Sequence, residues 1–274
     1  MSTSSTKITA RATAFHRLHH DGLLILANAW DAGSARLIES LGAPAIATTS
    51  AAVAWSHGYP DGDALPIQTL AATVAEITRV IRVPLSVDFE GGYSTDPATV
   101  GENVAQIIGA GAVGINLEDG SGSPDLLCAK IEHVKRTSGR LGVNLFVNAR
   151  TDAYLRNLVP AERRLAETLQ RAARYRAAGA DGIFVPGVVD APTITALVAT
   201  VQLPLNVLAR AGLPAAPALA ALGVRRLSAG SGLASAAYGR TAALTQAFLR
   251  DGVAAALAEG AMPYAEINAL LAPR

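Results

Sequence analysis

The chain has 274 residues, of which 50% are hydrophobic and 16% are charged, and its formal net charge is +1. This balance excludes the strongly basic surface of nucleic-acid-binding proteins and of proteins held on anionic membranes. The single cysteine, Cys128, excludes an intrachain disulfide, and no apolar stretch approaches the ~20 residues of a membrane span. The Ser/Thr-rich start does not resemble a secretory signal. We therefore expect a cytoplasmic protein with no nucleic acid and no membrane as partner.

Short β-branched or leucine-rich runs alternate along the chain with segments of helical period. Strands are expected at residues 23–27, 44–48, 84–89, 113–117, 144–148, 182–185, 205–208 and 225–228. Helices are expected after them, near residues 32–41, 66–81, 97–110, 126–138, 161–178, 191–200, 214–222 and 231–250. Eight β/α units predict a parallel sheet closed into a (β/α)8 barrel, the TIM-barrel fold of the α/β class, with helices outside.

One domain is expected to hold the whole chain, with the barrel over about residues 22–250 and one or two extra helices in a C-terminal appendage over residues 251–274. Such an appendage often packs on a neighbouring subunit, so a homo-oligomer is expected. The histidines at 16, 19 and 20 precede the first strand, and we expect them on the surface or in a helix. Cys128 is expected to pack as a small apolar residue.

Carboxylates follow two neighbouring predicted strands, at the barrel end where (β/α)8 enzymes bind their substrates. Asp88 and Glu90 are two residues apart on one strand and should point to the same side, and Glu118 ends the next strand. Three carboxylates at one barrel mouth repel each other unless a cation neutralises them. Oxygen ligands without a nearby Cys or His pair favour Mg2+, with Mn2+ as a substitute. The alternative is solvated loop carboxylates, each paired with a surface Lys or Arg.

Arg150 ends the fifth predicted strand and is the best candidate for binding an anion. A planar guanidinium can hold a carboxylate through two parallel hydrogen bonds. The alternative is a structural ion pair of Arg150 with Asp152 or Glu118.

From about Phe15 to about Arg250, the chain resembles the isocitrate lyase/phosphoenolpyruvate mutase superfamily. No single segment decides the resemblance, but the order and spacing of several are specific. These segments are Asn28-Ala29-Trp30-Asp31, Thr48-Thr49-Ser50, Gly58-Tyr59-Pro60-Asp61-Gly62, Asp88-Phe89-Glu90-Gly91-Gly92-Tyr93, Leu117-Glu118-Asp119, Asn148-Ala149-Arg150-Thr151-Asp152 and Leu205-Asn206-Val207.

The resemblance implies roles for these residues. Asp88 would be the main Mg2+ ligand, with Glu90 and Glu118 around it, partly through water. Arg150 would bind the far end of the substrate, and Asp61 would lie beside the reacting centre on a mobile segment. The remaining substrate contacts implied by the matching segments come from Trp30, Thr49, Ser50, Ala51 and Asn206. Superfamily members are commonly tetramers that exchange the last barrel helix, so a homotetramer with a swapped eighth helix is also implied.

The chain departs from the superfamily pattern after the fourth strand. Isocitrate and methylisocitrate lyases carry a Lys-x-Cys-Gly-His motif there, whereas this chain has a Gly/Ser-rich loop at residues 120–125. Glu90 stands where phosphonomutases carry an aspartate. These departures argue against isocitrate cleavage and, less strongly, against phosphoryl migration.

The expected activity is a Mg2+-dependent carbon–carbon lyase that acts through the enolate of a small 2-oxo or 2-hydroxy carboxylate, by C–C cleavage or decarboxylation. One alternative is a phosphonomutase or phosphonopyruvate hydrolase, which would break a P–C bond. Another is a barrel that binds oxo acids without turning them over.

Overall fold

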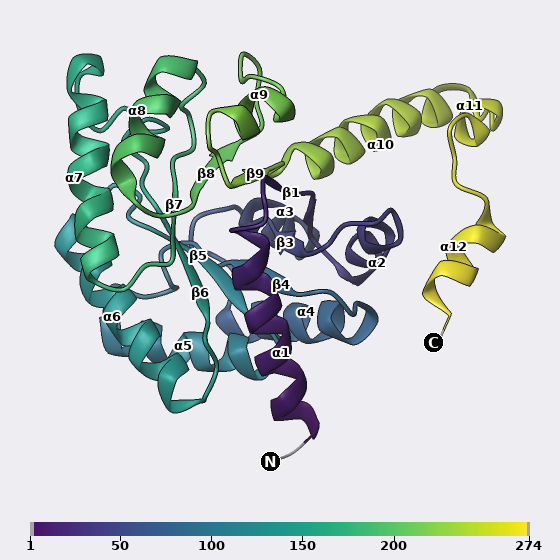
Figure 1. Cartoon of the computed structure of the whole chain (residues 1–274). Coiled ribbons are helices and arrows are strands. Elements are labelled where there is room, and N and C mark those ends of the chain that lie inside the picture. The colour runs from purple at the N-terminus through teal and green to yellow at the C-terminus, as the bar shows by residue number, and fades with distance from the viewer. Residues whose placement is uncertain (1–2, 273–274) are drawn as a thin grey trace.

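The computed structural model describes residues 3–272 and shows a parallel α/β barrel, as the sequence predicts (Figure 1). Its sheet runs in the order β1-β9-β8-β7-β6-β5-β4-β3-β2. The strands are β1 (Leu24–Leu26), β2 (Asn28–Ala29), β3 (Ile46–Thr48), β4 (Leu85–Asp88), β5 (Gly114–Glu118), β6 (Phe146–Arg150), β7 (Gly182–Phe184), β8 (Leu205–Leu208) and β9 (Arg226–Ser228).

The first predicted strand, residues 23–27, corresponds to β1, and an additional short strand that was not predicted, β2, follows it and helps to close the barrel. β1 pairs with β9, whereas β2 pairs with β3, and only Ala27 lies between the two segments. The two edges of the sheet therefore belong to one nearly continuous stretch of chain.

Helices follow the strands at all eight expected places. They are α2 (Ala32–Ser40), α4 (Ile67–Val80), α5 (Pro97–Gly109), α6 (Pro124–Arg140), α7 (Arg164–Ala177) after the short turn η1 (Ala161–Arg163), α8 (Ala191–Val201), α9 (Ala216–Ala221) and α10 (Gly232–Asp251). The appendage contains α11 (Ala255–Ala258) and α12 (Tyr264–Leu271), as expected. None of the described helices combines the length and apolarity needed to cross a membrane.

Two helices were not predicted: α1 (Thr3–Leu18) and α3 (Ser50–Ser56), which begins directly after β3. α1 brings Phe15 against Phe146 of β6, with ring centroids 5.6 Å apart. The histidines at 16, 19 and 20 thus lie in or just after a helix, as expected. However, His19 is not a surface residue, because only 1% of it is exposed.

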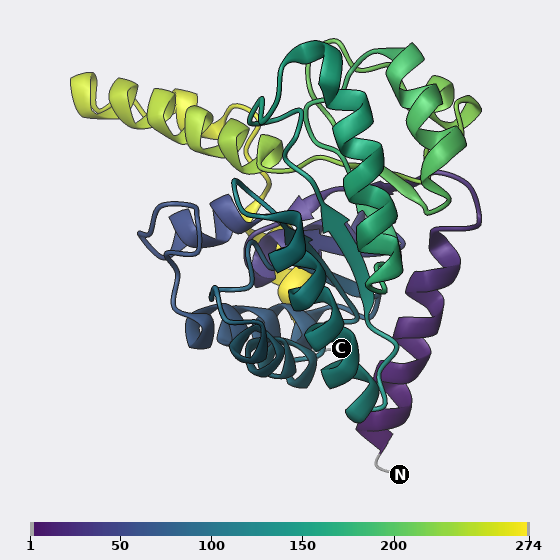
Figure 2. The ribbon, with the colours of Figure 1, turned by 90° about the vertical axis from the view of Figure 1, so that its left-hand side faces the viewer.

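The last barrel helix does not cover the barrel from which it starts. Figures 1 and 2 show α10 projecting away from the strands, and Ala234 is its one buried residue. α12 turns back and contacts α2. On β1, Leu24 and Leu26 are buried while Ile25 between them is 54% exposed. Since side chains alternate along a strand, the outer face of β1 lacks the helical cover that parallel strands usually have.

Candidate active site

A small pocket of about 120 Å³ lies at the carboxyl ends of the strands, where (β/α)8 barrels carry their active sites. Six of the sequence-predicted site residues line it: Thr49, Ser50, Ala51, Asp61, Asp88 and Arg150. The lining residues that were not predicted as site residues are Asn28, Asn116, Leu155, Phe184, Pro186, Leu208, Ser228, Gly230 and Ser231.

Asp88 lies at the last position of β4, and its side chain is held by Ser50, the first residue of α3, and by Asn116 of β5. One carboxylate oxygen, Oδ2, accepts hydrogen bonds from the backbone N–H and the hydroxyl of Ser50, both at 3.1 Å. The other, Oδ1, accepts from the Asn116 amide at 3.5 Å. The Asp88 backbone N–H donates to Thr48 Oγ1 at 2.8 Å. The carboxylate is therefore fixed in direction where the pocket meets the barrel interior.

Arg150 forms ion pairs with both Glu118 and Asp152, the two carboxylates that the sequence offered as structural partners. Its Nη1 lies 2.7 Å from Glu118 Oε2, and Nε and Nη2 donate to Asp152 at 2.7 and 3.1 Å. Arg150 still lines the pocket, so these ion pairs position the guanidinium without removing it from the site. Burial, assisted by Asp88 and Asp152, raises the pKa of Glu118 to about 8 despite Arg150.

Glu90 is not on the strand that carries Asp88, so the expectation that both point to one side is wrong. β4 ends at Asp88, and Glu90 has a left-handed backbone with φ of 47°. Its carboxylate instead accepts from the backbone N–H groups of Gly62, at 2.8 Å, and of Asp63, and from the Tyr93 hydroxyl at 2.8 Å. Glu90 thus anchors the loop that follows Asp61.

Trp30, Glu118 and Asn206 do not line the pocket, although all three were predicted to act there. Trp30 packs against the hydrophobic core, and Glu118 reaches the pocket only through Arg150. Asn206 is 1% exposed on β8, where its Oδ1 accepts a hydrogen bond from Ser228 at 3.1 Å.

Asn28 and Asn116 are pocket residues at predicted strand ends to which no role was assigned from the sequence. The Asn28 amide donates to Thr48 O at 2.7 Å, and its Oδ1 accepts from Gly230 N at 2.9 Å, so it joins the loops around the closure of the barrel. Asn116 is the register partner of Asp88 on the next strand. This pairing is the feature from which the proximity of Asn116 to Asp88 could have been inferred, because paired residues in parallel strands lie side by side.

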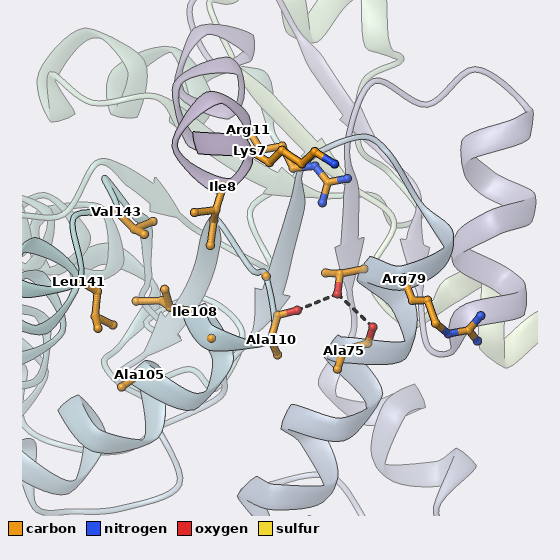
Figure 3. A pocket seen from close by; sticks show the side chains of 13 residues that line it. Lys7, Ile8, Arg11, Ala75, Arg79, Ala105, Ile108, Ala110, Leu141 and Val143 are labelled. Carbon is orange, nitrogen blue, oxygen red and sulfur yellow. Dashed lines mark hydrogen bonds between the residues drawn. The ribbon is translucent and has the colours of Figure 1, made fainter. Parts of the chain in front are cut away.

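Another cavity, of about 680 Å³, lies away from these residues, at the amino end of the barrel (Figure 3). Its floor is aliphatic, with Ile8 of α1 near Ile108 and Val143, and its cations are Lys7, Arg11 and Arg79. Figure 3 shows the Arg79 guanidinium directed away from the aliphatic floor. The described residues that line this cavity include no carboxylate, and this end of a (β/α)8 barrel generally serves stability.

A family model described as phosphoenolpyruvate phosphomutase matches residues 15–249. The chain belongs to this family. The match confirms the resemblance to the isocitrate lyase/phosphoenolpyruvate mutase superfamily, whose members are lyases and mutases. The chain is also 39% identical over 269 residues to an uncharacterized protein of Mycobacterium tuberculosis, which covers 94% of this chain and 96% of the relative.

A Burkholderia cenocepacia structure whose name suggests a phosphonomutase is 40% identical, with a TM-score of 0.82, covering 86% of this chain and 99% of its own. An oxaloacetate decarboxylase of Paraburkholderia xenovorans is 32% identical over 200 residues, covering 69% of this chain and 64% of the relative. A second Burkholderia cenocepacia structure is 34% identical to this chain, with a TM-score of 0.89 and 98% of both chains covered. Its name gives lyase and mutase as alternatives. A phosphonopyruvate hydrolase complex with oxalate and Mg2+, 23% identical, has a TM-score of 0.82 over 95% of this chain and 94% of its own, and it supports the fold alone.

Proposed function

We propose that this chain is a Mg2+-dependent carbon–carbon lyase that acts on a small 2-oxo carboxylate, with decarboxylation of an oxaloacetate-like acid as the leading reaction. The observation that carries the proposal is a fixed carboxylate, Asp88, and a guanidinium, Arg150, lining the same pocket of about 120 Å³. That volume is below the usual range for drug-sized ligands and favours an acid of a few carbons. Similarity to oxaloacetate decarboxylases agrees with this choice.

The side chains present suit a hard cation with few direct protein ligands. Among the described residues, no three His, Cys, Asp or Glu side chains are gathered closely enough to bind one ion. Mg2+ retains several waters and often uses one or two carboxylates, so Asp88 would bind it directly and Glu118 through water. Burial, together with the charges of Asp88 and Asp152, raises the pKa of Glu118, and a divalent cation would offset this effect. Glu90 would act indirectly, by holding the Asp61 loop.

Arg150 has donors left for a substrate. A guanidinium carries five N–H groups, and the contacts with Glu118 and Asp152 engage three of them. The remaining two can hold the distal carboxylate of a dicarboxylic acid. Thr49, Ser50 and Ala51 line the same pocket and would orient the 2-oxo carboxylate end. When bound, Mg2+ would stabilise the negative charge that develops on the oxo oxygen.

Asp61 lines the pocket from an exposed loop and is our candidate for exchanging a proton with the reacting carbon. Glu90 anchors this loop at the backbone N–H groups of Gly62 and Asp63. The loop can therefore place Asp61 over the substrate while remaining attached to the end of β4.

The decisive experiment offers purified protein a panel of 2-oxo and 2-hydroxy acids with Mg2+ and measures pyruvate or another released 2-oxo acid. Activity should disappear with a chelator and return with Mg2+. Asp88→Asn should lower kcat by about 100-fold or more. Asp96→Asn is the matched control, because Asp96 is an exposed cap of α5 outside the pocket. Full activity in the chelator or in Asp88→Asn would refute the proposal.

A second candidate is cleavage of a P–C bond, which the match to the phosphomutase family favours. Phosphorus NMR of phosphonopyruvate incubated with the protein distinguishes the candidates. Phosphate release indicates a hydrolase, phosphoenolpyruvate indicates a mutase, and an unchanged spectrum beside pyruvate release from oxaloacetate supports the carbon–carbon lyase. Calorimetric binding of oxalate with Mg2+, without turnover of any substrate, would instead indicate a binding protein.

We also propose that the protein is a homo-oligomer in which α10 packs on a second copy. α10 exposes Leu233, Tyr238, Phe248 and Leu249, while the outer face of β1 exposes Ile25. In a dimer or larger assembly, α10 of one copy would cover the exposed outer face of β1 in another copy, so that both apolar surfaces are buried. A tetramer is the expected assembly.

A further inference from the structure

The barrel interior below the pocket contains a buried cation, Arg226 on β9. Arg226 is 1% exposed and is the largest fully buried side chain in the described part of the chain. No carboxylate lies within ion-pair distance of it among residues 3–272, and Nη1 has no hydrogen-bond partner there. (β/α)8 interiors are usually filled by branched aliphatic residues, and an unpaired buried charge is costly. Its position therefore calls for an explanation beyond packing.

Arg226 begins a hydrogen-bond chain that ends on the Asp88 carboxylate. Its Nη2 donates to Asn116 Oδ1 at 3.3 Å, and the Asn148 amide donates to the same oxygen at 2.9 Å. The Asn116 amide nitrogen then donates to Asp88 Oδ1 at 3.5 Å. Asn116 thus accepts on one side and donates on the other, toward the carboxylate in the pocket.

A second chain begins at Nε of the same guanidinium. Nε donates to Ser228 Oγ at 3.3 Å, and this hydroxyl donates to Asn206 Oδ1 at 3.1 Å. Ser228 lines the pocket, whereas Asn206 is the register partner of Arg226 on β8. Both chains therefore join the centre of the barrel to the pocket floor.

Arg226 determines the direction of these hydrogen bonds because its guanidinium can donate hydrogen bonds but cannot accept them. An asparagine amide can exchange its donor and acceptor by a flip, and a hydroxyl can rotate, but a guanidinium has only donors. If Asn116 flipped, its NH2 would meet the donors of Arg226 and its oxygen would face the Asp88 carboxylate. The buried cation thus makes the flipped arrangement unfavourable at both ends.

We propose that Arg226 is a positioning residue, which fixes Asn116 as a donor to Asp88 and Ser228 as a donor to Asn206, and so sets the polar floor of the active site. The catalytic consequence rests on the proposed function, whereas the direction of the Asn116 amide does not. The alternative is that Arg226 merely fills space, in which case its donors have no effect on Asp88.

The test compares Arg226→Gln with Arg226→Lys. Lysine, like arginine, has only donors, whereas the glutamine amide can donate or accept. Arg36→Gln is the control, because Arg36 is also an enclosed arginine (8% exposed) but pairs with Glu39 on α2, outside the pocket. Thermal unfolding of all variants measures the purely structural cost of each change.

The first readout is the side-chain amide signal of Asn116, by NMR of metal-free protein labelled with nitrogen-15 on asparagine and assigned with Asn116→Ser. We expect the shift and the slow solvent exchange of this amide to be retained in Arg226→Lys and lost in Arg226→Gln. An unchanged Asn116 amide in Arg226→Gln would overturn the assignment. This readout needs neither metal nor substrate, so it remains decisive if the proposed function fails.

The second readout is kinetic and calorimetric. Arg226→Gln should lower kcat or Mg2+ affinity by about 10- to 100-fold, the usual effect of losing a residue that orients a metal ligand. Arg226→Lys should recover most of that loss, and Arg36→Gln should match the wild type. Wild-type kcat and Mg2+ affinity in Arg226→Gln would overturn the proposed role. Absence of both Mg2+ binding and turnover in the wild type itself would refute the lyase proposal instead.

Discussion

Replacing His19 by glutamine should reduce the loss of stability that the protein suffers in acid. The ring of His19 stacks on Phe146 with centroids 3.9 Å apart, and Nδ1 lies 2.9 Å from the carbonyl oxygen of Phe15. Nε2 is buried without a hydrogen-bond partner among the described residues. Burial and the nearby charge of Arg226 lower the pKa of His19 to about 3.

The sign of the effect follows from the direction of this pKa shift. The folded pKa lies below the ordinary value of 6.5, so the folded protein keeps a neutral ring while the unfolded chain takes up a proton. The stabilisation is complete above about pH 6.5 and is lost as the pH falls toward about 3. At about 1.4 kcal/mol per pH unit, the unfolding free energy should fall by about 2 kcal/mol between about pH 7.5 and 5 from this group alone.

Urea unfolding at several pH values in this range tests the argument. His19→Gln keeps a donor for the Phe15 carbonyl but cannot be protonated. Because it loses the ring that stacks on Phe146, it should be less stable than the wild type at neutral pH. The difference should shrink by about 2 kcal/mol as the pH falls to about 5. His20→Gln is the control, because His20 is exposed and should follow the wild type. A difference between His19→Gln and the wild type that stays constant with pH would refute the reasoning.

Other substitutions test the packing and the assembly. Phe15→Ala should lower the unfolding free energy measured in urea by about 3–5 kcal/mol, since Phe15 is fully buried. A loss below about 1 kcal/mol would contradict the importance of its packing against Phe146. Gly187→Ala should cost about 1–3 kcal/mol, because Gly187 has φ of 98° and an added Cβ would lie 2.9 Å from the backbone N of Leu155. Gly139→Ala, in open space on α6, should instead be neutral or stabilising by thermal unfolding. Light scattering should show an oligomer that Leu249→Glu dissociates, and a wild-type monomer would refute the packing proposed for α10.

The barrel could be predicted because its signals are local and repeated. The expected strand over residues 205–208 coincides with β8, and the other seven expected strands differ from those observed by a few residues at their ends. α1 escaped prediction because few of its side chains are buried, so its sequence shows little amphipathic period. Its helix is instead stabilised by contacts at the barrel base, such as those of Phe15, which depend on the assembled fold.

The candidate site could be predicted where residues end regular strands, as Asp88 and Arg150 do. Glu90 could not be placed, because one left-handed residue breaks the alternation along a strand. Arg226 escaped attention because Arg225 precedes it, and two adjacent arginines give no sign of which one faces the interior. The structure decides this, since Arg225 is exposed and Arg226 is enclosed.

If α10 covers the bare outer face of β1 in a second copy, the measured stability of this protein should depend on its concentration. If part of the barrel wall is supplied by another copy, dilution removes that cover and exposes Ile25 to solvent. The melting temperature should then rise with protein concentration, because association stabilises only the folded chain. Mixed assemblies of two differently tagged preparations should form only after enough dilution or time for α10 to be released.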